Sequence, residues 1–252
     1  MAMAVKKISP WSFTVATIIP VWREPAIRKV LSKFDKPYVD EVLVVLDEPT
    51  LEMRRAVGEG AKEAVPPVRV IENERRMGIG HAVRRGLEHC LRMAYEVVVV
   101  MAGNGKDDPR EIPRLLRAIE AGYDYVQGSR FLPGGRYEKL PFFRGVFVRL
   151  WPFIWTLLTG KRCTDVANGF RAYRTRLLKD PRINIWQEWL DHYALEYYLH
   201  YKALTLGYRF CEVPVSKVYP FRHRGGYSKI KPYRDWVHIV MPLILLRLGA
   251  RK

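Results

Sequence analysis

Residues 96–109 read EVVVVMAGNGKDDP, a run of β-branched side chains that ends in a polar cluster containing two glycines. Four consecutive valines are typical of a strand that is buried on both faces of a sheet. Similar apolar runs occur at residues 15–19 (VATII) and 41–46 (EVLVVL). The stretches between these runs place apolar residues three and four positions apart, as helices do. This alternation predicts an α/β fold, in which helices cover both faces of a mostly parallel central sheet.

The expected elements follow from the same periodicities. We expect strands at residues 15–19, 41–46, 68–71, 96–101 and 125–126, and helices at residues 25–34, 78–93 and 112–121. Pro20 should end the first strand, because proline cannot donate to the ladder of hydrogen bonds. The second half of the chain is more irregular and richer in aromatic residues, and it looks like an elaboration of the same domain. Within it, residues 164–174 mix an acid, an amide and aromatic and basic groups, and we expect them to form one short loop.

Ligands of such folds bind beyond the carboxyl ends of the strands, so the polar residues that follow each strand are candidate site residues. They are Arg23, Glu24, Asp47, Glu48, Asn73, Asn104 and residues 106–108. The carboxylates at 47 and 48 could accept hydrogen bonds from a nucleobase and a ribose, or could simply favour the start of the next helix. One of the aspartates at 107 and 108 should cap the helix that follows, which would leave Asn104 and Lys106 facing the crevice.

The charge of the chain is strongly basic and unevenly placed. Lys and Arg number 43 against 26 Asp and Glu, a net charge of +17. Residues 1–127 carry 20 basic and 18 acidic side chains, whereas residues 128–252 carry 23 and 8. This asymmetry favours an anionic partner such as phosphates or an acidic membrane, although a solubilising surface is the simpler alternative. No nucleic-acid-binding module is recognisable, so a nucleic-acid partner is not expected.

Two apolar, aromatic segments could contact a membrane surface. The segment at 142–159 combines Phe and Trp with Arg144 and Arg149, and the tail from Trp236 ends in basic residues. Their uncharged runs fall short of the roughly 18–20 residues that cross a bilayer. They therefore suit interfacial helices, with packing in the core as an equally weighted alternative.

These patterns give an expected organisation and location for the chain. We expect one catalytic domain over residues 1–232, which includes the interfacial helix at 142–159, and an amphipathic tail over residues 233–252. Three widely spaced cysteines and an amino terminus without a secretory signal favour the cytoplasmic face of the membrane, with peripheral attachment. The low content of four Asn and two Gln favours a thermophilic source.

Taken in order, eight short motifs resemble those of family-two glycosyltransferases, in particular the dolichol-phosphate (polyprenyl-phosphate) mannose synthases. The resemblance covers about residues 15–230. The motifs are Pro20 with Glu24, Asp47-Glu48, Asn73 with Gly78-x-Gly80-x-Ala82 and Gly86, the cluster ending in Asp108-Pro109, Gly128-Ser129-Arg130-Phe131, residues 168–173 (NGFRAY), Glu212-Val213-Pro214, and Arg224-x-Gly-x-Ser228-Lys229.

The resemblance implies a nucleotide-binding α/β/α sandwich of the GT-A type and inverting transfer of a hexose to a dolichyl or polyprenyl phosphate. It implies GDP-mannose as the favoured donor, with glucose as a possible sugar. Pro20, Glu24, Asp47 and Glu48 would hold the base and ribose, with Arg224 and Lys229 in a closing loop. Asn104 and Lys106 would lie at the donor diphosphate, and the acceptor phosphate would contact Arg130, Arg144 and Ser228.

One departure from the family concerns the metal ion. The family's D-x-D motif holds Mg²⁺ or Mn²⁺ against the donor diphosphate, but this chain has Ala102 and Asn104 at those positions. Hard divalent cations prefer anionic oxygen ligands, so we expect weak metal dependence, with Lys106 supplying positive charge. Asp107 and Asp108, with Asn104, could instead rebuild a metal site.

Two alternatives remain open from the sequence. Transfer to a glycan hydroxyl would need a general base, for which Asp165 or Glu196 could serve. The altered cluster at Asn104 also allows a nucleotide-sugar-binding protein whose catalysis has lapsed.

Overall fold

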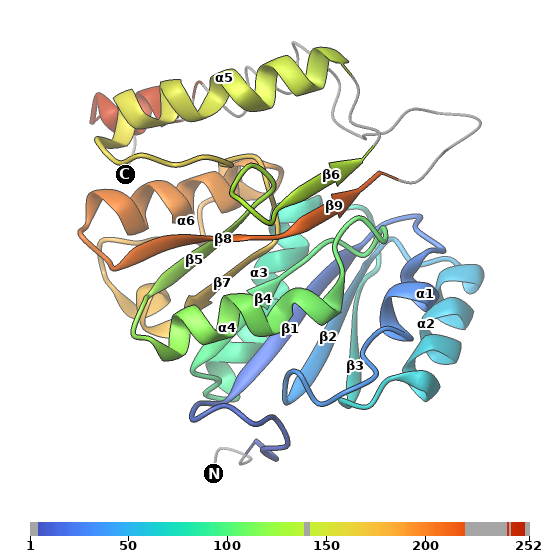
Figure 1. Cartoon of the computed structure of the whole chain (residues 1–252). Helices are drawn as coiled ribbons and strands as arrows, with labels where there is room; N and C mark the ends of the chain where they lie inside the picture. The colour runs from blue at the N-terminus through green and yellow to red at the C-terminus, as the bar shows by residue number, and fades with distance from the viewer. Residues whose placement is uncertain (1–4, 139–141, 220–240, 242, 250–252) are drawn as a thin grey trace.

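The computed structural model describes residues 5–138, 142–219, 241 and 243–249, and the side chains of residues 142–145 and 147 lie outside that description. A seven-stranded sheet in the order β3-β2-β1-β4-β7-β5-β8 forms the middle layer (Figure 1). Its strands are β1 (Val15–Val21), β2 (Glu41–Asp47), β3 (Val68–Asn73), β4 (Val97–Val100), β5 (Tyr125–Ser129), β7 (Arg171–Arg174) and β8 (Phe210–Pro214). A separate pair joins β6 (Arg136–Glu138) to β9 (Ser216–Val218).

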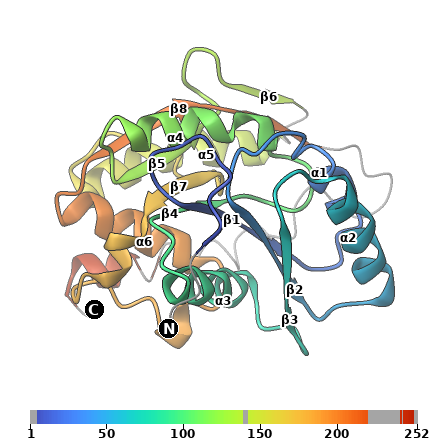
Figure 2. The same ribbon diagram turned by 90° about the horizontal axis from the view of Figure 1, so that it is seen from below.

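Helices cover both faces of this sheet, which confirms the predicted three-layer α/β/α architecture. They are α1 (Ile27–Leu31), α2 (Leu51–Glu63), α3 (Ile79–Arg92), α4 (Ile112–Glu120), α5 (Phe142–Thr159) and α6 (Ala194–Thr205), with short 3-10 turns at Pro109–Glu111, Thr175–Lys179 and Glu188–Leu190. Figure 2 shows α3 and α4 on opposite sides of the sheet.

The four valines of β4 show how one strand serves both cores. Val98 and Val100 belong to the cluster that includes side chains of α3, α5 and α6. Val97 and Val99 belong to the cluster that includes side chains of α1, α2 and α4. Side chains alternate between the faces of a strand, so a strand packed on both faces requires an uninterrupted apolar run.

Two predicted boundaries differ from the structure. β1 continues through Pro20 to Val21, because β4 pairs with β1 only as far as Ile18 and the missing N–H breaks no bond to β4. The helix expected at 25–34 is confined to α1, since the N–H groups of Lys33 and Phe34 bond to the carbonyls three residues earlier and tighten the last turn.

One predicted loop is wrong over part of its length. Residues 164–174 were expected to form a single loop, but Arg171–Arg174 form β7, which pairs antiparallel with β4 and with β5. Ala172 packs in one core and Tyr173 in the other, so this short strand fills the gap between two parallel strands. Its two arginines conceal the apolar pattern that would have indicated a buried strand.

Helix α5 packs in the core on one side and exposes apolar side chains on the other, and its contact with a membrane stays a prediction. Trp151 and Trp155 are buried against α6, whereas Leu150, Phe153 and Leu157 are more than 60% exposed. In the part of the chain that the structure describes, no helix has the length and apolarity needed to cross a bilayer. Of the predicted tail at 233–252, the described residues 241 and 243–247 are helical, and its division from residues 1–232 stays a prediction.

Gly80 allows the start of α3 to approach the backbone around Asp191. A Cβ on Gly80 would overlap the carbonyl oxygen of Leu190 and lie 2.6 Å from that of His192. The His81 N–H donates to the Asp191 carbonyl at 3.0 Å, so the two segments are held in direct contact. A side chain at position 80 would force these segments apart.

We expect Gly80→Ala to lower the free energy of unfolding by about 1–3 kcal/mol, the usual cost of overpacking. Gly58→Ala is the matched control, because Gly58 lies in α2 with no atom within 4 Å of its added Cβ. That control should gain about 0.5–1 kcal/mol from helix propensity. Urea unfolding measures both, and equal effects at the two positions would contradict the close approach.

Candidate functional site

The ends of β1 and β2 carry backbone strain. Arg23 and Glu48 follow these strands with φ angles of 47° and 55°, and Ala94 is the only other non-glycine residue with positive φ in the described chain. This region of conformational space is costly for residues with a Cβ, and such strain is concentrated at functional sites.

The carboxylate of Glu48 accepts hydrogen bonds from Trp22 Nε1 at 3.0 Å and from Arg23 at 3.4 Å. Arg76 lies 3.7 Å over the Trp22 ring.

Asp47 is buried, and both oxygens of its carboxylate accept hydrogen bonds from the protein backbone. One oxygen accepts from the Met77 N–H at 2.9 Å and the other from the Gly78 N–H, also at 2.9 Å. Asn73 donates a longer bond to the same carboxylate. Thr50, not Asp47, caps α2, so Asp47 fixes the loop that leads into α3. Its predicted contact with a nucleotide stays a prediction.

The other residues predicted at this edge are close in space but differ in exposure. Pro20 is half-buried within β1, and Glu24, in the turn before α1, is only 6% exposed. Pro20 lies near the end of the strand that Trp22 and Glu24 follow, so the strand order places both Pro20 and Glu24 beside the end of β2. Their predicted role in holding a base and ribose stays a prediction.

The loop after β4 is held by its own polar side chains. Asn104 Oδ1 accepts from the Lys106 N–H at 3.2 Å, and Asp107 Oδ2 accepts from the Ala102 N–H at 3.0 Å. Asp108 caps the turn at Pro109 by accepting from the Arg110 N–H, and it forms a 2.7 Å ion pair with Lys33. The prediction that one of the two aspartates caps the next helix is therefore confirmed for Asp108.

Lys217 of β9 is a buried cation that the sequence did not single out. Its ammonium donates to Asp107 Oδ1 at 2.7 Å and to Asn168 Oδ1 at 2.9 Å. Asn168 is fully buried, and its Nδ2 donates to the Gly128 carbonyl. One lysine between Ser216 and Val218 gives no local signal, because its partners lie far away in the sequence.

Arg130 lies in a buried ion pair after β5. Its Nε and one terminal nitrogen each donate to Asp165 at 2.6 Å, and both side chains are at most 1% exposed. Its other terminal nitrogen donates to the Tyr219 hydroxyl at 2.7 Å. Burial disfavours the charge, yet the hydrogen bonds and charge of Asp165 raise the pKa of Arg130 above its ordinary value.

Arg130 and Lys106 therefore meet at Tyr219. The Lys106 ammonium lies 5.0 Å from the centre of the Tyr219 ring, whose hydroxyl binds Arg130. A phosphate bound directly by Arg130 would compete with Asp165 for the guanidinium. The contact of Arg130 with the acceptor phosphate stays a prediction. So does the contact of Arg144, whose side chain lies outside the described residues. Arg224, Ser228 and Lys229 also lie outside them.

Of the two candidate general bases, Glu196 has the longer ion pair. Asp165 is bound to Arg130 through both oxygens, whereas Glu196 is 3.8 Å from Arg171 Nε and 23% exposed. Burial raises the pKa of Glu196 above its usual value, and the charges of Arg171 and Lys217 oppose that rise.

The residues present after β4 do not fit a divalent cation. Position 102 is Ala, both oxygens of Asp107 are hydrogen-bonded, and Asp108 is taken up by a cap and an ion pair. Asn104 offers one neutral oxygen, which accepts from the backbone. Among the residues that the structure describes, no group of three His, Cys, Asp or Glu side chains could hold a metal ion.

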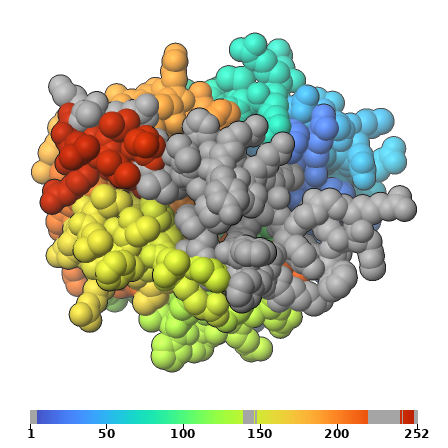
Figure 3. Space-filling model, turned by 90° about the horizontal axis from the view of Figure 1, so that it is seen from above, coloured from blue at the N-terminus to red at the C-terminus, as the bar shows by residue number. Residues whose placement is uncertain are grey.

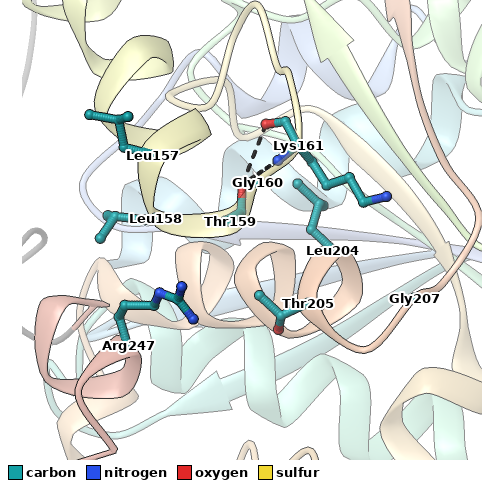
Figure 4. Close-up of a pocket in the computed structure, with 9 residues that line it drawn as sticks. All are labelled: Leu157, Leu158, Thr159, Gly160, Lys161, Leu204, Thr205, Gly207 and Arg247. Atoms are coloured by element: carbon teal, nitrogen blue, oxygen red, sulfur yellow. Dashed lines mark hydrogen bonds between the residues drawn. The ribbon is translucent and has the colours of Figure 1, made fainter.

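A hollow of about 430 Å³ lies elsewhere, at the carboxyl ends of α5 and α6 (Figure 4). Lys161 and Arg247 supply cations at its rim, and Leu157, Leu158 and Leu204 supply apolar wall. Since no residue from the loops after β1, β2 or β4 lines this hollow, we assign it to the surface that carries α5 and not to the candidate site at the strand ends.

Comparison with known proteins places this geometry in a family. The family model described as "Glycosyl transferase family 2" matches residues 17–180. The chain is 32% identical over 237 residues to a dolichyl-phosphate hexose transferase of Haloferax volcanii, covering 90% of this chain and 91% of that protein. It is 27% identical over 205 residues to an undecaprenyl-phosphate mannosyltransferase of Micrococcus luteus, covering 81% and 83%.

Two further similarities are shorter or more distant. A polyprenol monophosphomannose synthase of Mycolicibacterium smegmatis is 32% identical over 149 residues, which is 59% of this chain and 56% of that protein. Glucosyl-3-phosphoglycerate synthase of Mycobacterium tuberculosis, solved with Mn²⁺, UDP-glucose and phosphoglyceric acid, matches with a TM-score of 0.66 at 17% identity. That match covers 96% of this chain and 82% of that one, and it shows the fold alone.

Proposed function

The chain is a glycosyltransferase of family 2, and from that premise we propose that it transfers a hexose from a nucleotide sugar to a dolichyl or polyprenyl phosphate at a membrane surface. Mannose is the favoured sugar and GDP-mannose the favoured donor. The similarity to the Haloferax volcanii hexose transferase over nine tenths of both chains carries the proposal. The Micrococcus luteus relative, named for transfer to undecaprenyl phosphate, supports the same class of acceptor.

The proposed reaction needs little from the protein beyond positioning and positive charge. An oxygen of the acceptor phosphate attacks the anomeric carbon, the bond from that carbon to the donor diphosphate breaks, and the nucleoside diphosphate leaves with the electron pair. A phosphate monoester is already ionised at neutral pH, so the attack requires no general base. Inversion at the anomeric carbon follows from a single displacement.

The proposed roles divide the site between donor and acceptor. Pro20, Glu24, Asp47 and Glu48 would surround the base and ribose, with Arg224 and Lys229 closing over the donor. The strained backbone at Arg23 and Glu48 supports a binding role for this edge. Asn104 and Lys106 would face the diphosphate, and Arg130, Arg144 and Ser228 would lie on the acceptor side. For Arg130, the buried pair with Asp165 supports a role in fixing the loop after β5 more than direct binding of the phosphate.

Weak metal dependence is proposed from the loop after β4. No carboxylate there is available to a divalent cation, and the ammonium of Lys106 is held near Tyr219. Lys106 would supply part of the charge that stabilises the leaving diphosphate, in place of a bound cation. The donor's own phosphates can still recruit Mg²⁺, so chelation is the direct test.

Peripheral attachment to the cytoplasmic face of the membrane is proposed from the surface of α5. Figure 3 shows α5 beside the C-terminal helical residues on one face of the molecule. The exposed side chains of Leu150, Phe153 and Leu157 lie on α5, and Lys161 and Arg247 line the adjoining hollow. Apolar side chains beside cations suit the boundary between acyl chains and anionic headgroups.

Transfer to a sugar hydroxyl is the second candidate function. It is favoured by Glu196, whose raised pKa and partial exposure suit a general base. This alternative would be favoured if the wild type glycosylated a free sugar and the Glu196→Gln variant did not.

Incubation of the purified protein with labelled GDP-mannose and a short polyprenyl phosphate tests the proposed function. We expect label in the lipid product and none on free sugars. Arg130→Ala and Arg144→Ala should each lower kcat/KM for the lipid phosphate by about 10–100-fold. Arg144→Ala removes a charged partner worth about 1.5–3 kcal/mol, and Arg130→Ala leaves Asp165 without its partner and frees the loop after β5.

The exposed Arg162 provides the control. Arg162→Ala should leave kcat/KM for the lipid phosphate and the affinity for the donor unchanged. Donor affinity of the two test variants should stay near that of the wild type. Normal acceptor kinetics combined with lost donor affinity would reverse the assignment of the two sides.

Turnover in excess EDTA tests the proposed charge of Lys106. The native enzyme should retain most of its activity, and Lys106→Ala should lose it by about tenfold or more, since a charge near the leaving group is removed. Complete loss of native activity on chelation, restored by Mn²⁺, would refute weak metal dependence. A Lys106→Ala variant with normal turnover in EDTA would refute the role of the lysine.

Flotation with anionic liposomes tests membrane attachment. The protein should float at low salt and less so at high salt, because salt screens the attraction to the headgroups. Phe153→Glu with Leu157→Glu should abolish flotation, whereas Leu51→Glu, at an equally exposed leucine of α2, should not. Resistance of the bound protein to a carbonate wash would indicate insertion instead of peripheral contact.

A further inference from the structure

Lys217 joins two loops that are distant in sequence. Its ammonium lies 2.7 Å from Asp107 Oδ1, in the loop after β4, and 2.9 Å from Asn168 Oδ1, in the loop before β7. All three side chains are buried. A cation held between oxygens of two separate loops fixes their relative position, which is the organising effect that a bound metal ion has on its ligands.

The rest of β9 strengthens this attachment. The Val218 N–H donates to the Lys106 carbonyl at 3.1 Å, so the strand binds the loop through its backbone as well as through Lys217. Within the loop, Asp107 uses its second oxygen to hold the Ala102 N–H at 3.0 Å. The two ends of the segment 102–107 are thereby fixed, and Asn104 and Lys106 lie between them.

Charge balance explains why a cation is needed at this point. Asp107 is 1% exposed, and a buried carboxylate without a cation is strongly disfavoured. Either a metal ion or an ammonium can supply the compensating charge. This chain supplies the ammonium from Lys217, and the donor set it leaves does not fit a divalent cation.

We propose that Lys217 is a positioning residue of the donor site, a built-in cation that holds the loop 102–107 in its binding conformation without a divalent metal ion. This inference rests on the proposed function only in taking that loop to face the donor diphosphate. Lys217 acts through Asp107 and Asn168, and it does not itself touch the reacting atoms.

Four proteins test the proposal: the wild type, Lys217→Met, the double variant Lys217→Met/Asp107→Asn, and Lys33→Met. The double variant removes both buried charges, so it should regain the thermal stability that Lys217→Met loses. Lys33→Met is the matched control, because Lys33 forms an ion pair of the same 2.7 Å length with the neighbouring Asp108. Calorimetry with GDP and with UDP, each in EDTA and in Mn²⁺, gives the affinities.

We expect the wild-type affinity to change by less than about threefold between EDTA and Mn²⁺. Lys217→Met and the double variant should each bind the nucleoside diphosphate about tenfold or more weakly, because both lose the charge-assisted contact between Lys217 and Asp107. Lys33→Met should bind it as tightly as the wild type does. A larger effect of EDTA on the wild type would overturn the proposal. So would a double variant that recovers both stability and affinity, since Lys217 would then only neutralise Asp107.

Hydrogen exchange separates failure of this inference from failure of the proposed function. If neither GDP nor UDP binds the wild type, the proposed donor is wrong, but the loop can still be followed. The backbone amides of residues 102–107 should exchange faster in the double variant than in Lys33→Met, because only the former frees the loop. Equal exchange in the two variants would overturn the role of Lys217.

Discussion

Burial of the central strands on both faces is the constraint on which the rest of the structure depends. All seven residues of β2 and all four of β4 are buried, and the only polar side chains in these two strands, Glu41 and Asp47, lie at the two ends of β2. Polar groups are therefore confined to the points where the strands end, and parallel strands bring those points to one edge. The loops after β1, β2 and β4 contain most of the candidate site for this reason.

The polar groups of loops confined to one edge need partners within those loops or in neighbouring elements, and buried ion pairs supply some of these partners. Arg130 with Asp165, and Lys217 with Asp107, are almost entirely removed from water. In a medium of low dielectric an unpaired partner would be strongly disfavoured, so each pair holds its loop in one arrangement. Exposed pairs such as Arg54 with Glu72 contribute little by comparison.

The sequence predicts the parallel half of the fold because its signals are local. The valines of β4 and the helical spacing before it each fall within a short window, and both elements are observed. β7 was missed because it is four residues long, begins and ends with arginine, and is buried by contacts with distant strands. A helix cap at Asp107 or Asp108 was predictable from their place before Pro109, and the structure shows that it is Asp108. The partners of Lys217 were not predictable, since pairing across 110 residues leaves no local pattern.

The pair of Asp107 and Lys217 also constrains how this chain can change over generations. Substitution of either residue alone leaves a buried charge without its partner, and the other member then becomes a liability to folding. The two positions are energetically coupled, so the effect of a change at one depends on the residue present at the other. A lineage can therefore gain or lose this arrangement only by nearly simultaneous replacement, or through an intermediate that has stability to spare.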